Sequence, residues 1–346
     1  MTTVTLARNA MATRFEIVLH GRSARQLRSA GEEALDEIER LEGQLSLFQP
    51  TSEIAHINRA AAGGPVRVEP GLFRLLSRAQ QLSRETGGAF DITVAPLMRC
   101  WGFQGGTGKF PTKKEIAAAR ACVGMERVEL DERDFTVRFA RAGMMLDLGA
   151  IGKGHALERA AQLLREAGVK SALLHGGTST VCAIGAPPGR SAWKVAIQDP
   201  KAELNQEGRK AGTEPKLSGS DASASGFQLS CFPDSRPGRV LATVNLKDES
   251  LSVSASWGKS FEANGKVYGH VLDPRTGAPV EGAVLAAVVL QSATESDALS
   301  TALLTAGIEG RKEIVKLREG MRWLVVGRGK KPEQFRIASH GIEPAD

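Results

Sequence analysis

The sequence predicts an α+β fold, in which antiparallel or mixed sheets pack against amphipathic helices. Two observations support this class: short segments in which apolar and polar residues alternate, and longer segments that carry one apolar stripe at helical spacing. The chain has 346 residues, of which 42% are hydrophobic, so it can bury a sizeable core. We expect a globular protein, built as one large domain or as two interlocked ones.

The first elements are predicted from apolar periodicity. Residues 11–20 alternate as a half-buried strand does, and a glycine follows them. Residues 23–45 then carry apolar side chains at steps of three, four and seven, which predicts a helix with Ser23 as a plausible N-cap. A polar loop at residues 45–52 leads into a short helix.

The loop before the short helix has two interpretations. In the first, Ser52 caps the helix, and Ile54 and Ile57 face the core. In the second, Phe48 or Asn58 lies at the rim of a pocket.

A second amphipathic helix is predicted over residues 70–86, where it stops at two glycines. The apolar segment 89–103 follows and contains Asp91 and Thr93, which is unusual for pure core. Asp91 can cap the next turn or contact a ligand. Further strands are predicted at residues 128–130, 136–139, 171–174, 193–198, 240–244 and 251–257.

Residues 146–155 predict a short apolar strand that passes through three glycines into a helix starting near His155. Gly149, Gly152 and Gly154 would let the backbone lie directly against a ligand, and a helix N-terminus favours an anion. A strand-to-helix turn also needs glycine for steric reasons, so both explanations stay open. The spacing fits neither a Walker-type loop nor the dinucleotide fingerprint. A second glycine turn, at residues 175–178, is expected on the same side.

Two further segments carry candidate catalytic groups. His270 is expected at the end of a strand, directly before the turn at residues 273–277. A lone histidine is more often structural than functional, and the adjoining turn narrows this difference without deciding it. Asp297 and Thr301 share one face of a predicted helix, with Ser296 or Asp297 as its N-cap. Capping alone explains Asp297, yet a carboxylate and a hydroxyl one turn apart also make half of a magnesium site.

Charge and composition exclude several classes of protein. The 45 basic and 39 acidic residues give a net charge of +6 without any dense Lys/Arg block, which could help to attract a polyanionic small molecule. With one Tyr and four Trp, no stacking platform for nucleic acid is expected. The four cysteines have no Cys-x-x-Cys spacing, so we expect free thiols rather than a zinc site or a disulfide framework. They are Cys100, Cys122, Cys182 and Cys231.

The sequence shows no export signal and no stretch long enough to span a membrane. We therefore expect a cytoplasmic protein, which would be periplasmic or membrane-anchored only if a leader had been removed. Residues 199–238 are rich in Lys, Glu, Gly and Ser, and they predict a solvent-exposed, partly disordered insertion.

Six segments occur in an order that resembles the ApbE family of FAD:protein FMN transferases. They are Met11-Ala12-Thr13, residues 88–103, residues 147–154, Gly176-Gly177, residues 270–277 and residues 297–302. The resemblance extends from about residue 11 to residue 328. It implies that residues 1–346 form a single ApbE-like (T-fold-like) domain with its core at 11–328 and FAD in a cleft between two intertwined subdomains.

The resemblance also implies a reaction. Family members use magnesium to transfer the FMN half of FAD to a Ser or Thr hydroxyl of an acceptor flavoprotein, forming a phosphoester and releasing AMP. The acceptor would be a separate protein with an Asp-x-x-Ser/Thr-Gly-Ala-Ser/Thr motif, because this chain has none. Two alternatives remain: an FAD pyrophosphatase that gives FMN and AMP, and a non-catalytic FAD-binding protein.

Site residues are carried over from the family by motif position. His270 would position or deprotonate the acceptor hydroxyl, and Asp297 would serve both catalysis and metal binding. The metal ligands would be the carbonyl of Gly152, the carboxylate of Asp297 and the hydroxyl of Thr301. The flavin nucleotide would contact Met11, Phe48, Ala89, Phe90, Asp91, Gly149, His155 and Val271.

The sequence departs from the family pattern at several positions. Gly152 replaces a usual alanine, which should change little if the ligand is a carbonyl. Phe48 and His155 stand where tyrosine is common, so the ring system of the flavin could pack differently. Ser254 lies in a Val-Ser-Ala sequence where Thr-Ser-Gly is common.

Overall fold

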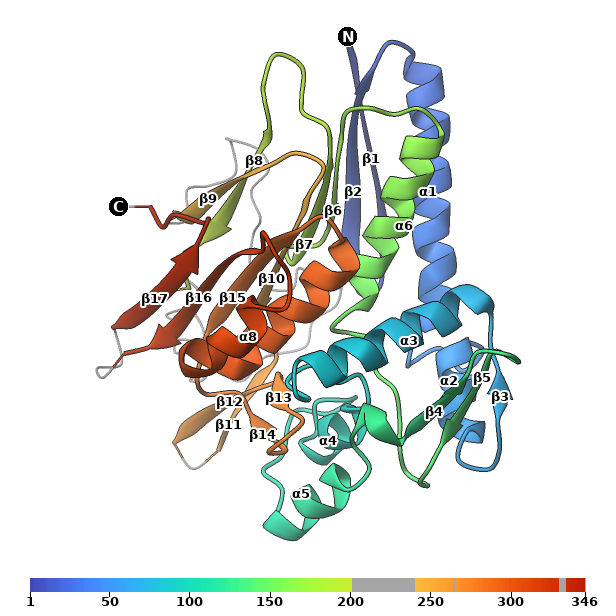
Figure 1. The fold of residues 1–346 in the computed structure, drawn as a ribbon, viewed down its shortest axis with the longest axis vertical. Helices are drawn as coiled ribbons and strands as arrows, with labels where there is room; N and C mark the ends of the chain where they lie inside the picture. Colours follow the sequence, from blue (N-terminus) through green and yellow to red (C-terminus); the bar gives the residue numbers. More distant parts are fainter. Residues whose placement is uncertain (201–239, 264, 330–333, 346) are drawn as a thin grey trace, which may run out of the picture.

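The computed structural model describes residues 1–200, 240–263, 265–329 and 334–345. Its centre is an eight-stranded sheet in the order β1-β2-β6-β7-β10-β15-β16-β17 (Figure 1). Every neighbouring pair is antiparallel, which agrees with the predicted α+β class. The strands are β1 (Thr2–Ala10), β2 (Thr13–Gly21), β6 (Ala172–Gly176), β7 (Thr180–Ile184), β10 (Ser250–Ala255), β15 (Leu285–Leu290), β16 (Arg322–Arg328) and β17 (Phe335–His340).

Three long helices cover one face of this sheet: α1 (Ala24–Leu45), α6 (Gly152–Glu166) and α8 (Ala293–Val315). Their apolar stripes and the facing strand residues form the largest hydrophobic cluster, which includes fully buried Phe15 and Ile38. This packing fixes the first turns of α6 and α8 next to each other, near the middle of the view in Figure 1.

An antiparallel pair of strands, β8 (Trp193–Gln198) and β9 (Val240–Leu246), covers the opposite face of the sheet. Alternate residues of both strands are buried, and Val195 and Leu246 join a second cluster with Val181 and Val289 of the main sheet. The sheet is therefore apolar on both faces.

A group of smaller elements lies below the main sheet in Figure 1. Its helices are α2 (Glu53–Ala60), α3 (Pro70–Glu85), α4 (Ala95–Cys100) and α5 (Lys113–Arg120). A three-stranded sheet has the order β3 (Val66–Arg67), β5 (Thr136–Phe139), β4 (Val128–Asp131), with a short 3₁₀ helix at Met125–Arg127. Two ribbons complete the group: β11 (Ser260–Ala263) with β12 (Lys266–Gly269), and β13 (Leu272–Asp273) with β14 (Ala278–Pro279).

The strand expected at the start of the glycine segment is absent, because residues 146–148 have irregular backbone. The side chain of Asn58 takes the place of a neighbouring strand: Oδ1 accepts from Leu146 N–H at 2.7 Å, and Nδ2 donates to its carbonyl at 3.0 Å. Asp147 N–H donates to the Ile92 carbonyl at 2.7 Å. This segment therefore links the smaller elements to α6, which begins at Gly152, three residues before the expected start.

Two other element boundaries also differ from expectation. The first strand starts at Thr13, because Met11 and Ala12 have φ of 49° and 57° and form the turn from the unforeseen strand β1. The N-cap of α8 is Ser292, whose side chain accepts from Glu295 N–H, so neither Ser296 nor Asp297 caps this helix. Asp297 lies inside the helix, where its carboxylate is available to another element.

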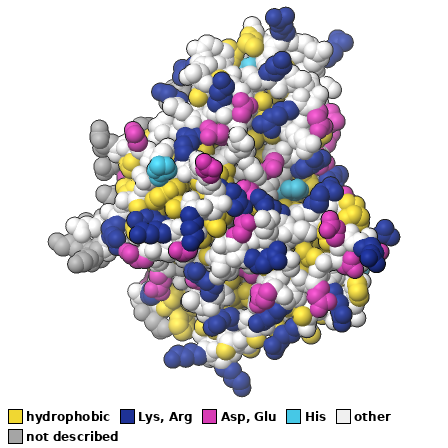
Figure 2. All heavy atoms as spheres, viewed as in Figure 1, with side chains coloured by type: hydrophobic (Ala, Val, Ile, Leu, Met, Phe, Trp, Pro, Cys, Tyr) yellow, Lys and Arg dark blue, Asp and Glu magenta, His cyan; other side chains and the backbone are white. Residues whose placement is uncertain are grey.

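Most of the insertion expected at 199–238 lies outside the described residues. Cys100, Cys122 and Cys182 are free thiols, as expected, and Cys231 falls within the part not described. No helix in the described ranges is long and apolar enough to cross a membrane. On the face shown in Figure 2, Lys and Arg side chains are interspersed with acidic ones, as their distribution along the sequence indicates.

Candidate active site

A cleft of about 520 Å³ lies between the end of the main sheet and the smaller elements. Its walls come from residues 89–104, 147–153, 178–179, 253–259 and 270–274, and from Asp297 and Thr301 of α8. Gly149 and Lys153 of the first glycine turn line this cleft, and so do Thr178 and Ser179, which directly follow Gly176-Gly177. The two glycine turns therefore lie beside one cavity, as expected.

Asp297 connects α8 to the first turn of α6. Its Oδ2 accepts a hydrogen bond of 2.9 Å from the main-chain N–H of Gly154. A Cβ at residue 154 would lie 2.2 Å from the Ala293 carbonyl oxygen and 2.7 Å from Cβ of Asp297. Gly154 is thus required for the close approach of the two helices.

Hydroxyl groups surround the second proposed metal ligand on α8. Thr301 Oγ1 lies 3.1 Å from Ser254 Oγ and donates to the Asp297 carbonyl at 3.3 Å. Ser254 Oγ is also 2.8 Å from Ser300 Oγ. Ser254, whose role the sequence left open, therefore orients Thr301 from strand β10.

These donors suit a hard divalent cation. The Asp297 carboxylate is buried and has no ion pair among the described residues. Burial raises its pKa, while the charge of Lys153 and hydrogen bonds from Gly154 N–H and the Thr180 hydroxyl act in the opposite direction. A carboxylate and a hydroxyl one turn apart supply oxygen atoms, which are the ligands that magnesium prefers.

Gly152 itself does not line the cleft, although it lies two residues before Gly154 in the same helical turn. A Cβ there would meet only Leu148 Cβ, at 3.9 Å, so the structure has room for the alanine that is usual in the family. Within the described ranges, no three His, Cys, Asp or Glu side chains gather as a metal site. A magnesium site here would consequently depend on hydroxyl, carbonyl and substrate oxygens besides Asp297.

Lys153 is a functional candidate that sequence analysis did not identify. It is half-buried and lines the cleft, and its Nζ donates to the Gly149 carbonyl at 3.3 Å. All three of Lys153, Asp297 and His270 line the same cleft, and the charge of Lys153 lowers the pKa of both other groups. Its position among the three glycines was the available signal, because a phosphate-binding turn commonly pairs main-chain N–H groups with a lysine.

His270 lines the same cleft and is half-buried at the end of β12. Its Nδ1 is 3.2 Å from the Lys259 carbonyl, which can only accept, so the neutral ring carries its proton on Nδ1. Burial lowers the pKa of His270 to about 4; the charges of Lys259 and Lys153 act in the same direction, and the bond to the Lys259 carbonyl opposes them. At pH 7 the ring is therefore neutral, and its Nε2 can accept a proton.

Six of the proposed flavin contacts line the cleft: Phe48, Ala89, Phe90, Asp91, Gly149 and Val271. Phe48 is 72% exposed, which fits its interpretation as a rim residue. Asp91 is buried, and its carboxylate already accepts from the Ser83 hydroxyl and the N–H groups of Thr93 and Met125. It therefore shapes the wall of the cleft as well as lining it.

The structure does not bring Met11 and His155 to this cleft. The Met11 N–H donates to Glu42 Oε1 at 2.7 Å in the turn between β1 and β2. His155 faces a separate polar cavity of about 550 Å³ between α1, α3, α6 and α8, and burial lowers its pKa. The reason is helical geometry: His155 lies two residues after Lys153, hence on the opposite side of α6.

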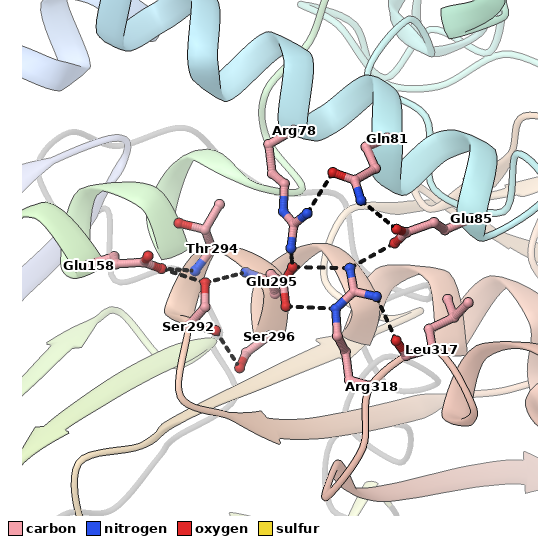
Figure 3. A network of polar contacts seen from close by, with 10 residues as sticks. All are labelled: Arg78, Gln81, Glu85, Glu158, Ser292, Thr294, Glu295, Ser296, Leu317 and Arg318. Carbon is pink, nitrogen blue, oxygen red and sulfur yellow. Dashed lines mark hydrogen bonds and ion pairs between the residues drawn. The ribbon is translucent and has the colours of Figure 1, made fainter.

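A polar network holds the start of α8 in place behind the cleft (Figure 3). The Glu158 carboxylate accepts from the Ser292 hydroxyl at 2.7 Å and from Thr294 N–H at 2.8 Å. Glu295 pairs with Arg78 of α3 and with Arg318, at 2.9 Å for the latter. The network thus joins α3, α6 and α8, two residues before Asp297.

A comparison with known protein families matches residues 11–325 to the ApbE family. This chain belongs to the ApbE family. Among curated ApbE relatives, an FAD:protein FMN transferase of Rhodobacter capsulatus is 30% identical over 74% of the chain, and one of Salmonella typhimurium is 27% identical over 80%. The chain spans 43% of the length of the former and 71% of the latter.

Solved ApbE structures share the fold. The ApbE protein of Thermotoga maritima aligns with a TM-score of 0.77 at 26% identity, covering 94% of both chains. The antiparallel sheet with its helices is thus the ApbE fold, as the sequence motifs indicate.

Proposed function

We propose that this protein is an FAD:protein FMN transferase, which uses magnesium to attach FMN to a Ser or Thr hydroxyl of an acceptor flavoprotein and releases AMP. The observation that carries the proposal is the presence of Asp297, Thr301, Lys153 and His270 in one cleft. The names of the relatives support flavin transfer, and this donor set supports the metal-dependent chemistry.

In this proposal, Asp297 and Thr301 hold magnesium together with the Gly152 carbonyl, and Lys153 neutralises further phosphate charge. Magnesium bound there would polarise the phosphate oxygens of FAD and orient the diphosphate. The cleft wall at residues 89–91, with Phe48 and Val271, would hold the flavin nucleotide. Positioning and charge neutralisation are the main demands of phosphoryl transfer.

His270 supplies the proton acceptor. The Ser or Thr hydroxyl of the acceptor protein gives its proton to Nε2 of His270, while the hydroxyl oxygen forms a bond to the phosphorus on the FMN side. The bond from that phosphorus to the bridging oxygen breaks at the same time, and AMP leaves with that oxygen. The hydrogen bond to the Lys259 carbonyl keeps the proton of the neutral ring on Nδ1 and so leaves Nε2 available.

One assay tests the proposal and its alternatives. The protein is incubated with FAD, Mg²⁺ and an acceptor domain that carries the Asp-x-x-Ser/Thr-Gly-Ala-Ser/Thr motif. Flavin bound covalently to the acceptor, with one AMP released per flavin, is the expected result. Free FMN and AMP without labelling would instead indicate an FAD pyrophosphatase, and unchanged FAD would indicate a binding protein.

A further inference from the structure

The β11–β12 ribbon ends at His270, and its hydrogen-bonding pattern determines which groups face outward. His270 N–H donates to the Lys259 carbonyl at 3.0 Å, so residues 259 and 270 form a hydrogen-bonded pair. Along antiparallel strands, hydrogen-bonded pairs alternate with non-hydrogen-bonded pairs, whose N–H and C=O groups point away from the partner strand. In the observed register, the non-hydrogen-bonded pairs are Glu262 with Val267 and Ser260 with Gly269. The N–H and C=O groups of Val267 and Gly269 therefore point away from β11.

These outward groups have no partner within the described parts of the chain. The ribbon is a two-stranded sheet, and no hydrogen bond to the outward main-chain groups of Val267 or Gly269 occurs there. The Val267 side chain is 54% exposed. An open strand edge of this kind can take up an extended peptide as an additional strand.

Aromatic packing fixes the ribbon beside the cleft. The rings of Phe261 and Tyr268 stack at 5.5 Å, and Tyr268 lies 5.7 Å from Trp101 between ring centroids. Phe261 is 5.6 Å from Phe103, which lines the cleft. The edge of β12 is thus held at a defined place relative to His270, and in Figure 1 the ribbon lies next to β13 and β14.

We propose that an extended segment of the acceptor protein adds to the outer edge of β12 as a third strand and thereby delivers its hydroxyl to His270. This inference rests on the proposed function. A strand advances ~3.3 Å per residue. If one residue of the added strand lies opposite Gly269, its neighbour in the direction of His270 consequently lies opposite His270.

Charge at the end of the ribbon indicates the chemistry of this segment. Lys259 is exposed and Lys153 is half-buried, and neither has an ion pair among the described residues. Both line the cleft near His270. The Asp of the acceptor motif, which the resemblance places three residues before the Ser or Thr, would then approach these cations.

Proline substitution at the two edges provides a matched test. Val267→Pro removes an outward N–H and leaves the ladder to β11 intact, and Glu262→Pro makes the same change on the opposite edge. With the acceptor domain as substrate, Val267→Pro should raise the KM for the acceptor about tenfold, whereas Glu262→Pro should leave it unchanged. Equal FAD affinity in both variants verifies that they fold. Equal KM values in the two variants would overturn the inference.

Amide hydrogen exchange provides a measurement that needs no variant of this chain. The protein with FAD is mixed with an acceptor domain whose target Ser or Thr is replaced by Ala. Slower exchange at Val267 and Gly269 than without acceptor is expected, and unchanged exchange at both would contradict strand addition. If the unaltered acceptor is never labelled by the wild-type protein, the proposed function fails. If it is labelled while both tests are negative, only the docking inference fails.

Discussion

The main-chain N–H of Gly154 donates a hydrogen bond of 2.9 Å to Oδ2 of Asp297, 143 residues further along the chain. This bond joins the first turn of α6 to the first turns of α8, and it orients the carboxylate that we propose as a magnesium ligand. Both helices contribute side chains to the cleft, so the site depends on how closely they approach each other.

Gly154→Ala should damage the site. The added Cβ would lie 2.2 Å from the Ala293 carbonyl oxygen, so α6 and α8 must separate. We expect a loss of about 1–3 kcal/mol in the free energy of unfolding, as for other overpacked positions, together with loss of FAD cleavage. Gly152→Ala is the control, because its nearest new contact is 3.9 Å away. Equal denaturation midpoints for the two variants would show that the helices do not need this contact.

Asp297→Asn should remove metal binding while leaving the fold intact. The amide oxygen can still accept from Gly154 N–H, but the negative charge is lost. We expect FAD turnover to fall by ~100-fold or more, as when a main electrostatic group is removed. Wild-type protein should melt at a higher temperature in Mg²⁺ than in EDTA, and the variant should show no such difference. A Mg²⁺-dependent shift that persists in the variant would exclude Asp297 as a ligand.

The pH profile should reflect the lowered pKa of His270, about 4. As a base it must be neutral, so kcat/KM for transfer should stay level from pH 8 to about pH 5 and fall only below that. A fall centred near pH 6.5 would mean an unperturbed histidine. His270→Ala should reduce kcat more than it weakens FAD binding, and a defect confined to FAD affinity would remove the proposed role.

The same pKa has a consequence for stability. Because the folded pKa lies below the ordinary value of 6.5, the unfolded state binds more protons between pH 6.5 and pH 4. His270 therefore lowers stability as the pH falls through this range. Thermal melting of the wild type should lose more stability between pH 7 and pH 5 than melting of His270→Ala, and parallel losses would contradict this.

Arg318→Ala should destabilise the start of α8. Arg318 bonds to Glu295 at 2.9 Å and to Glu85 at 2.7 Å, and its side chain is 20% exposed. Its removal leaves two partly buried carboxylates short of a partner, so we expect a loss of about 1–3 kcal/mol in urea denaturation. Lys316→Ala, which breaks the exposed pair with Glu313, is the control and should cost less than about 0.5 kcal/mol.

Local signals in the sequence predicted local structure. Ser23 and Ser52 were expected as N-caps and cap α1 and α2, because an N-cap depends only on the next three residues. The buried stripes of α1 and α3 follow the expected spacing for the same reason. Ile54 and Ile57 are fully buried, so the structural interpretation of that helix is confirmed.

Errors arose where distant residues decide the structure. Residues 146–148 have the composition of a strand, but Asn58 occupies the position of a pairing partner. Asp297 resembles an N-cap, yet it bonds to Gly154 inside the fold. His155 lies on the side of α6 away from the cleft, and resemblance by position does not reveal which side of a helix a residue occupies.

The order of motifs predicted more of the site than any single motif did. It indicated that Asp297, Thr301 and His270 belong together, and the structure places all three in one cleft. Lys153 and Ser254 had no assigned role, because their contributions come from contacts with Gly149 and Thr301 that only the folded chain reveals.

The cleft draws its walls from residues as far apart as Phe48 and Thr301. The cleft that we propose as the FAD site is therefore incomplete in a nascent chain until α8 has emerged from the ribosome, when most of the protein has been made. Fragments released by premature termination before residue 297 would lack the carboxylate and the hydroxyl of α8. They should not retain FAD on a desalting column, so incomplete synthesis products would not sequester flavin in the cell.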